Sequence, residues 1–214
     1  DIVDFYPVSS FDKDPARKQD LQKELDRTAF ELQELRTLVP DAEVYYQEGN
    51  HESRLTRYLW KRAEELASLR SLALPELLNF KKLGITWIPQ GTVKTIGHLN
   101  HIHGNEIAGG STYPAKNIFL KAPGNIICGH YHKIQSHYHR MLDGNLYGVW
   151  TNGCLCSLTP EYMLLPQWQQ GFSLVRYAKS GAFHVDQIPL FPNPDGPGLA
   201  CLTEGKLFTQ RGSI

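Results

Sequence analysis

Residues 42–52 read AEVYYQEGNHE, a strand-like run that leads directly into Gly49-Asn50-His51-Glu52. Val and Tyr within the run favour an extended strand. Asn and His supply oxygen and nitrogen donors, which are typical of sites for Mn, Fe, Zn or Ni. The stretch therefore predicts a strand that ends in a metal-binding loop.

Three further groups of metal-ligand residue types lie elsewhere in the chain. Residues 103–104 (HG) follow an apolar run at 99–102, and residues 129–132 (GHYH) follow the short run NIIC. Residues 1–4 (DIVD) stand at the start of the sequence. In α/β folds, functional sites gather beyond the carboxyl ends of strands. We therefore expect the four groups to converge at one edge of a sheet and to support metal-assisted hydrolysis.

Helix and strand patterns alternate in the first half of the chain, and strands dominate the second. Asp14-Pro15 predicts the start of a helix that continues through Leu35 and ends before Pro40. A second helix is predicted from Leu55 to Leu69 by its apolar spacing. Further expected elements are strands at 42–47, 85–88, 93–96, 99–102, 125–128, 136–142, 146–151, 172–177 and 183–188, a loop at 109–110 and a helix at 114–120. This order predicts an α/β fold, a two-sheet sandwich flanked by helices, with an antiparallel second sheet.

The length and charge of the chain limit the possible classes of protein. Its 214 residues suffice for one domain with a sizeable core, and we expect residues 1–190 to form a single domain. Residues 191–214 are rich in Pro and Gly and are predicted to form an irregular C-terminal tail. The 22 basic residues balance 22 acidic ones, which argues against a strongly basic nucleic-acid surface. No apolar run approaches the roughly 18 residues of a membrane span, so no membrane partner is expected.

Four cysteines are present, and two of them form a Cys154-x-Cys156 pair. A structural zinc knuckle normally needs more such ligands at close intervals. We therefore expect ordinary reduced thiols in a cytoplasmic protein, with a redox or zinc role for the pair left open.

Taken together, the four groups resemble the motifs of the calcineurin-like metallophosphoesterase superfamily. That pattern runs D-x-H, G-D-x-x-D, G-N-H-D/E, H-G and G-H-x-H. DIVD at 1–4 is similar to the second motif without its Gly, and residues 49–52, 103–104 and 129–132 are similar to the last three. The resemblance covers about residues 1–152, and the wider sequence is similar to phage and prophage members. The D-x-H motif and its N-terminal strand are missing here, so we expect an upstream segment in the natural protein.

The resemblance implies a centre of one or two divalent metal ions, with Mn favoured over Fe, Zn or Ni. The implied metal ligands are Asp1 bridging two ions, Asn50, His103 and His130 at the second site, and His132 at the first. His51 would act as the general acid at the leaving group, and Asp4 would hold its imidazole in orientation. Arg54 would bind a phosphate oxygen or pair with Glu52 or Asp4, and Tyr131 would line the substrate pocket or pack.

The leading hypothesis is a metal-dependent phosphoesterase that hydrolyses a phosphomonoester or a phosphodiester with a metal-activated water. Its substrate is a phosphate ester, with nucleotides and short nucleic acids within the class. One alternative is a non-catalytic or degenerate metal-binding scaffold that lacks the upstream D-x-H ligands. Another is a structural zinc protein, which needs a closed four-ligand site. The sequence leaves the oligomeric state open.

Overall fold

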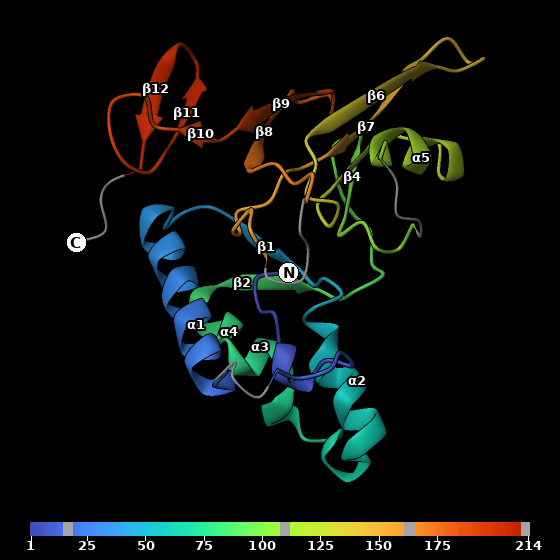
Figure 1. The fold of residues 1–214 in the computed structure, drawn as a ribbon. Coiled ribbons are helices and arrows are strands. Elements are labelled where there is room, and N and C mark those ends of the chain that lie inside the picture. The colour runs from blue at the N-terminus through green and yellow to red at the C-terminus, as the bar shows by residue number, and fades with distance from the viewer. Residues whose placement is uncertain (15–18, 108–111, 161–165, 211–214) are drawn as a thin grey trace. The chain divides into compact units, whose positions relative to one another are not determined.

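The computed structural model describes residues 1–14, 19–107, 112–160 and 166–210. The chain divides into two compact units, residues 1–92 and residues 93–214, which we call the N-terminal and C-terminal units. Most of the helices belong to the N-terminal unit and most of the strands to the C-terminal unit (Figure 1). The fold is therefore a mixed α/β arrangement, as the sequence predicts. A single domain over residues 1–190 stays a prediction.

Helices surround two short parallel strands in the N-terminal unit. In chain order, the elements are the 3₁₀ helix η1 (Tyr6–Val8), α1 (Leu21–Leu38), β1 (Val44–Gln47), α2 (Ser53–Arg62), the 3₁₀ helices η2 (Glu64–Leu66) and η3 (Arg70–Leu72), α3 (Leu74–Leu77), α4 (Phe80–Leu83) and β2 (Ile85–Ile88). β1 and β2 pair in parallel, with Val44 opposite Ile85. The core of the unit joins the start of the chain to α1, β1, α3, α4 and β2. Val3 and Phe5 are almost fully buried in it, which fixes the positions of Asp1 and Asp4.

Both predicted helices of this unit differ from the sequence-based expectation at one end. The first was expected to start at Asp14-Pro15, but residues 15–18 lie outside the described part. In the described part the helix begins at Leu21, where the Asp20 side chain accepts hydrogen bonds from the first free backbone N–H groups. The second helix ends at Arg62 rather than Leu69. The backbone leaves the helical conformation at Ala63, with φ of −156° and ψ of 56°, and the chain continues as the separate 3₁₀ helix η2.

A five-stranded sheet forms the centre of the C-terminal unit. The elements are β3 (Lys94–Ile96), β4 (Leu99–Ile102), α5 (Pro114–Lys121), β5 (Ile126–Cys128), β6 (Gln135–Arg140), β7 (Leu146–Thr151), β8 (Gly171–Tyr177), β9 (Phe183–Pro189), β10 (Phe191–Pro192), β11 (Leu199–Thr203) and β12 (Lys206–Thr209). The sheet has the order β3-β4-β5-β7-β6. β4, β5 and β7 are parallel, and β3 and β6 are antiparallel edge strands.

The expected antiparallel pairing holds for β6 with β7 and for β8 with β9, but β7 also pairs in parallel with β5, so these strands do not form one antiparallel sheet. The connection from β4 to β5 contains α5, and a crossover of this kind is what a parallel pair requires. The loop predicted at residues 109–110 lies in this connection, outside the described residues. The β8–β9 hairpin forms a separate antiparallel pair.

The two faces of the five-stranded sheet bury different partners. Because successive strand residues point to opposite faces, Ile126 and Cys128 pack against α5, while Ile127 packs on the other face with Trp150 and side chains of the β8–β9 hairpin. Both clusters include side chains of β4, β5 and β7. The three parallel strands are thus covered on each face, and their ends are held in register.

The predicted irregular tail is also wrong over residues 191–209. β10, β11 and β12 form a three-stranded antiparallel sheet, and Ala200 and Cys201 of β11 are buried. Glu204 and Gly205 both have positive φ, 53° and 71°, as the two central residues of a type I′ hairpin turn require. Glu is an unusual first residue for that turn, which is why the sequence signal is weak.

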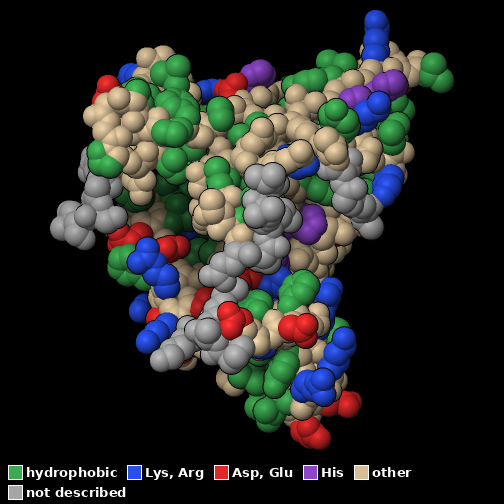
Figure 2. Space-filling model, viewed as in Figure 1, with side chains coloured by type: hydrophobic (Ala, Val, Ile, Leu, Met, Phe, Trp, Pro, Cys, Tyr) green, Lys and Arg blue, Asp and Glu red, His purple; other side chains and the backbone are tan. Residues whose placement is uncertain are grey.

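The surface charges and the helices of the described residues show how the charged and apolar residues are distributed. Lys and Arg side chains are interspersed with Asp and Glu on the face shown in Figure 2. Among the described helices, none has the length and apolar character that crossing a bilayer requires.

Candidate metal centre

The N-terminal unit places the DIVD segment beside the GNHE loop. The loop follows the carboxyl end of β1 and leads into α2. The His51 backbone N–H donates to Oδ1 of Asp1 over 2.9 Å, and Ser53 Oγ donates to the Asn50 carbonyl over 2.9 Å. Two segments that are about fifty residues apart in sequence are thereby joined at one place, as the motif order predicts.

His51 and Asp4 form a close imidazole–carboxylate pair. Nδ1 of His51 lies 2.9 Å from Oδ1 of Asp4. Burial acts to raise the pKa of Asp4, but the hydrogen bond with His51 and the positive charge of Arg54 outweigh it and hold that pKa below its usual value. Asp4 is therefore ionised at neutral pH and is able to fix the orientation of the imidazole. The predicted contact is confirmed, and the catalytic role of His51 stays a prediction.

Arg54 pairs with Asp4 rather than with Glu52. Its guanidinium forms an ion pair with the Asp4 carboxylate and donates to the Asp4 carbonyl oxygen over 2.7 Å. It also lies over the Phe11 ring, 5.6 Å from the ring centroid. The ion-pair alternative is thus present in the structure, and phosphate binding by Arg54 stays a prediction.

Glu52 is a buried acceptor that organises this half of the site. It is 2% exposed, and its carboxylate accepts hydrogen bonds from the Ile2 N–H over 2.7 Å, from the Tyr46 hydroxyl over 2.7 Å and from the Gly49 N–H over 3.0 Å. Burial and the neighbouring Glu52 raise the pKa of Tyr46, so its hydroxyl keeps the proton that it donates. Sequence reasoning did not identify this role of Glu52, because its Ile2 partner comes from a segment fifty residues away.

In the C-terminal unit, candidate ligands follow adjacent parallel strands. His103 comes directly after β4, and Gly129-His130 comes directly after β5. The Gly129 N–H donates to the His103 carbonyl over 2.9 Å, and the rings of His103 and His130 lie 5.1 Å apart between centroids. Asn152 follows β7, and its N–H donates to the Cys128 carbonyl over 2.8 Å. The carboxyl ends of the three strands thus meet at one edge of the sheet, as expected.

Unusual backbone conformations shape the GHYH loop. His130 and His132 have φ of 61° and 55°, in the left-handed region that non-glycine residues rarely adopt. Between them, the Tyr131 hydroxyl donates to the carbonyls of Gly104 and Ile107 over 3.1 and 2.8 Å. Tyr131 therefore ties the GHYH loop to the HG loop, and its role in lining a substrate pocket stays a prediction.

Gly104 leaves room for His130, which leads to a first prediction. Its φ is 126°, and a Cβ at this position would lie 3.0 Å from Cβ of His130. Gly104→Ala should lower the free energy of unfolding by roughly 2–4 kcal/mol, from backbone strain and overpacking together. Denaturant unfolding measures the loss. The matched control is Gly144→Ala, because Gly144 has φ of 81° with nothing within 4 Å of its Cβ position. Equal losses in the two variants would contradict the close approach to His130.

The His132 side chain lies close to Trp168 and to two cysteines. Its ring meets the edge of Trp168, 4.4 Å away between centroids. One ring nitrogen of His132 and the sulfur atoms of Cys154 and Cys156 all lie within 4.8 Å of one another. The C-x-C pair is visible in the sequence, but its proximity to His132 is not, because the whole β6–β7 hairpin lies between them in the chain.

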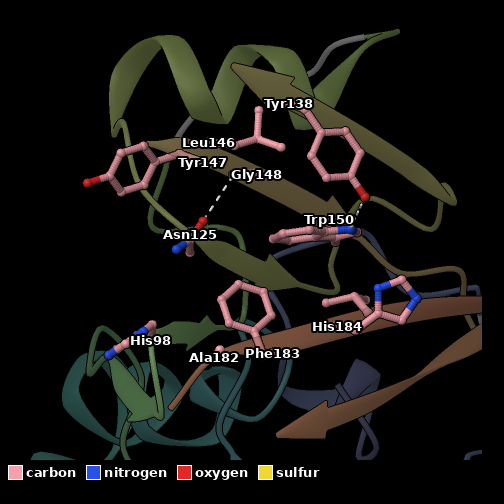
Figure 3. Close-up of a pocket in the computed structure, with 11 residues that line it drawn as sticks. His98, Asn125, Tyr138, Leu146, Tyr147, Gly148, Trp150, Ala182, Phe183 and His184 are labelled. Atoms are coloured by element: carbon pink, nitrogen blue, oxygen red, sulfur yellow. Dashed lines mark hydrogen bonds between the residues drawn. The ribbon is translucent and has the colours of Figure 1, made fainter. Parts of the chain in front are cut away.

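A cavity of about 300 Å³ in the C-terminal unit is separate from these residues (Figure 3). Its lining residues are His98, Asn125, Tyr138, Leu146, Tyr147, Gly148, Trp150, Ala182, Phe183, His184 and Val185. Two of its polar groups are already paired: Asn125 Oδ1 accepts from the Gly148 N–H, and the Tyr138 hydroxyl oxygen accepts from Nε1 of Trp150. None of the predicted site residues lines this cavity, so it is no candidate for the metal centre.

Comparisons with known proteins add no family assignment: no protein-family model matches the chain, and no curated protein matches it. The donor atoms themselves suit a divalent metal ion. The N-terminal unit offers the carboxylate of Asp1 and the amide of Asn50, and the C-terminal unit offers the imidazoles of His103 and His130. Mixed oxygen and nitrogen donors of this kind are typical of Mn, Fe, Zn or Ni sites.

Proposed function

We propose that the chain is a metal-dependent phosphoesterase with the two-sheet sandwich of the calcineurin-like metallophosphoesterases. The observation that carries the proposal is the His51–Asp4 pair, with 2.9 Å between Nδ1 and Oδ1, beside a loop of candidate ligands. A scaffold that only binds metal has no use for an imidazole held by an ionised carboxylate. A hydrolase needs such a group to protonate a leaving oxygen.

In the proposed centre, Asp1 and Asn50 of the N-terminal unit act with His103, His130 and His132 of the C-terminal unit. Two divalent ions held by these groups would lower the pKa of water and stabilise the charge of the reacting phosphate. The adjacent rings of His103 and His130 support a shared ion for this pair. The assignment of both units to one centre rests on the order and spacing of the four motifs.

The remaining residues would act on the substrate and on each other. His51 would place a proton near the leaving-group oxygen, and Asp4 would keep the imidazole in position through Nδ1, which leaves Nε2 for the substrate. Arg54 would also hold the Asp4 carboxylate, since it pairs with the same oxygen atom, Oδ1, that His51 contacts. Glu52 would hold the GNHE loop through its hydrogen bonds to backbone groups.

The test combines elemental analysis with an assay on the same sample. After Mn loading, we expect bound metal and turnover of bis-p-nitrophenyl phosphate or p-nitrophenyl phosphate, which distinguish diester from monoester hydrolysis. His103→Ala should lose both metal and turnover, because the variant lacks one imidazole ligand. The matched control is His101→Ala, which removes a nearby imidazole that lies 3.0 Å from the Tyr177 hydroxyl.

The possible results separate the alternatives. Metal binding without turnover of any phosphate ester would favour the non-catalytic scaffold. Unchanged metal content in His103→Ala would remove His103 from the ligand set and overturn the proposed centre.

A further inference from the structure

Cys154, Cys156 and His132 form a donor cluster within the C-terminal unit. Their sulfur and nitrogen atoms lie within 4.8 Å of one another. In a tetrahedral zinc site, bond lengths of about 2.3 Å to sulfur and 2.0 Å to nitrogen put neighbouring donor atoms roughly 3.5–3.8 Å apart. Small rotations about the side-chain bonds would bring the three donor atoms from their present separation to the separation that zinc requires.

The backbone around the cluster is fixed by hydrogen bonds from a third segment. The Cys154 N–H donates to the Gln169 carbonyl, and the Gln169 N–H donates to the His132 carbonyl, each over 2.8 Å. The Gly171 N–H donates to the Cys154 carbonyl over 3.0 Å, and Cys154 forms a parallel bridge with Gln170. The segment before β8 therefore lies between the histidine loop and the C-x-C pair and holds the two together.

Two further contacts shape the cluster. Gly153 permits a close approach to the same segment, since a Cβ there would lie 2.4 Å from the Gln169 carbonyl oxygen. The Cys156 carbonyl accepts a hydrogen bond from Nε2 of Gln170 over 2.7 Å. Cys154 is buried and Cys156 is exposed, so an ion would reach the cluster from the Cys156 side while Cys154 stays shielded.

We propose that His132, Cys154 and Cys156 bind a zinc ion through one imidazole nitrogen and two thiolates, with the fourth position open to solvent. Two thiolates with one imidazole form a soft donor set, which selects Zn²⁺ over the oxygen-preferring Mn²⁺ and Mg²⁺. Three protein ligands with one open position are the arrangement of zinc sites that bind an exchangeable ligand. The site differs chemically from the proposed phosphoesterase centre, in which no thiolate takes part.

The zinc site does not rest on the proposed function. All its residues belong to the C-terminal unit, and the proposal stands even if the chain hydrolyses no phosphate ester. The proposed phosphoesterase centre also includes His132, so an ion bound by the two cysteines would take this ligand from that centre, and a turnover assay alone would mix the two claims. The test therefore measures metal–sulfur bonds directly.

The experiment uses the whole chain, reduced and freed of metal with a chelator, and titrated with Co²⁺ as a spectroscopic probe for Zn²⁺. We expect a sulfur-to-cobalt charge-transfer absorption that saturates at one ion per chain and disappears when Zn²⁺ displaces Co²⁺. X-ray absorption of the zinc-loaded protein should show two sulfur ligands. Zinc should also protect two thiols from a thiol reagent.

Variants assign the ligands. Cys154→Ser and Cys156→Ser should each weaken zinc binding by at least about 10²-fold, more than the loss typical of an outer-shell partner. His132→Ala should weaken binding while the sulfur-to-cobalt absorption remains. The matched control is Cys201→Ser, which removes a buried thiol of β11 outside the cluster and should leave the absorption unchanged. Far-UV circular dichroism checks that each variant is folded.

Three results would overturn the proposal. One is the absence of a charge-transfer band in the reduced wild-type protein. Another is a band that persists in the folded Cys154→Ser/Cys156→Ser double variant. The third is an X-ray absorption spectrum of the zinc-loaded wild-type protein that shows no sulfur ligand.

Discussion

His51→Ala should lower the turnover of a phosphate ester by about 10²–10⁴-fold while the metal content of the protein stays unchanged. The variant removes the proton donor expected at the leaving-group oxygen but none of the proposed ligands. The measurement is the turnover rate at saturating substrate, with elemental analysis of the same preparation. The loss should be smallest for substrates with good leaving groups such as p-nitrophenolate, because these need little protonation.

Asp4→Asn provides the graded comparison. Asn keeps the size of the side chain but removes the charge that orients His51 and pairs with Arg54. Its turnover should fall less than that of His51→Ala, and the double variant should be no worse than His51→Ala alone, because Asp4 acts through His51. Loss of metal on replacing His51 would instead make His51 a ligand and would contradict the general-acid assignment.

Glu52→Ala should lower the free energy of unfolding by roughly 3–5 kcal/mol. The substitution removes the common acceptor of the Ile2 and Gly49 N–H groups and of the Tyr46 hydroxyl, and leaves a void in the core. A buried donor without a partner costs about 1–3 kcal/mol, and the substitution leaves several donors without an acceptor at once. Urea unfolding followed by circular dichroism measures the change.

Two glutamate variants separate the hydrogen bonds from the charge. Glu52→Gln keeps one acceptor oxygen and should cost less than Glu52→Ala. Glu65→Gln changes an exposed side chain and should stay within about 0.5 kcal/mol of the wild type. A loss below 1 kcal/mol in Glu52→Ala would show that Glu52 does not organise the loop.

Local signals account for the parts of the fold that could be predicted. Glycine-containing turns separate the predicted strands: Gly97 lies between β3 and β4, and the β6–β7 hairpin turns at Asp143-Gly144-Asn145, where Asp143 Oδ1 accepts from the Asn145 N–H. Both signals lie within a few residues of the structure that they predict. The bond of Glu52 to the Ile2 N–H and the approach of His132 to the C-x-C pair join residues far apart in the chain, and no local pattern specifies such partners.

In the candidate site, the pairs of motifs that meet could be predicted from the sequence, but the local backbone conformations could not. Asp4 meets His51, and His103 meets His130, because each motif follows or precedes a strand or loop that sequence patterns identify. The left-handed backbone of His130 and His132 was not predictable, since such conformations at non-glycine residues are fixed by their surroundings.

The close approach of Gly97 to Gly181 has a consequence for metal selectivity. A Cβ at Gly97 would lie 2.6 Å from the Gly181 carbonyl oxygen, which also accepts a hydrogen bond from the His98 N–H over 3.0 Å. This contact joins the turn before β4 to the turn of the β8–β9 hairpin, whereas His103 follows the opposite end of β4. With β4 anchored at its start and packed along its length, His103 has little freedom to follow a larger or smaller ion. In the proposed centre, a stiff ligand strand of this kind would discriminate between ions by radius, which the choice of donor atoms alone does not do.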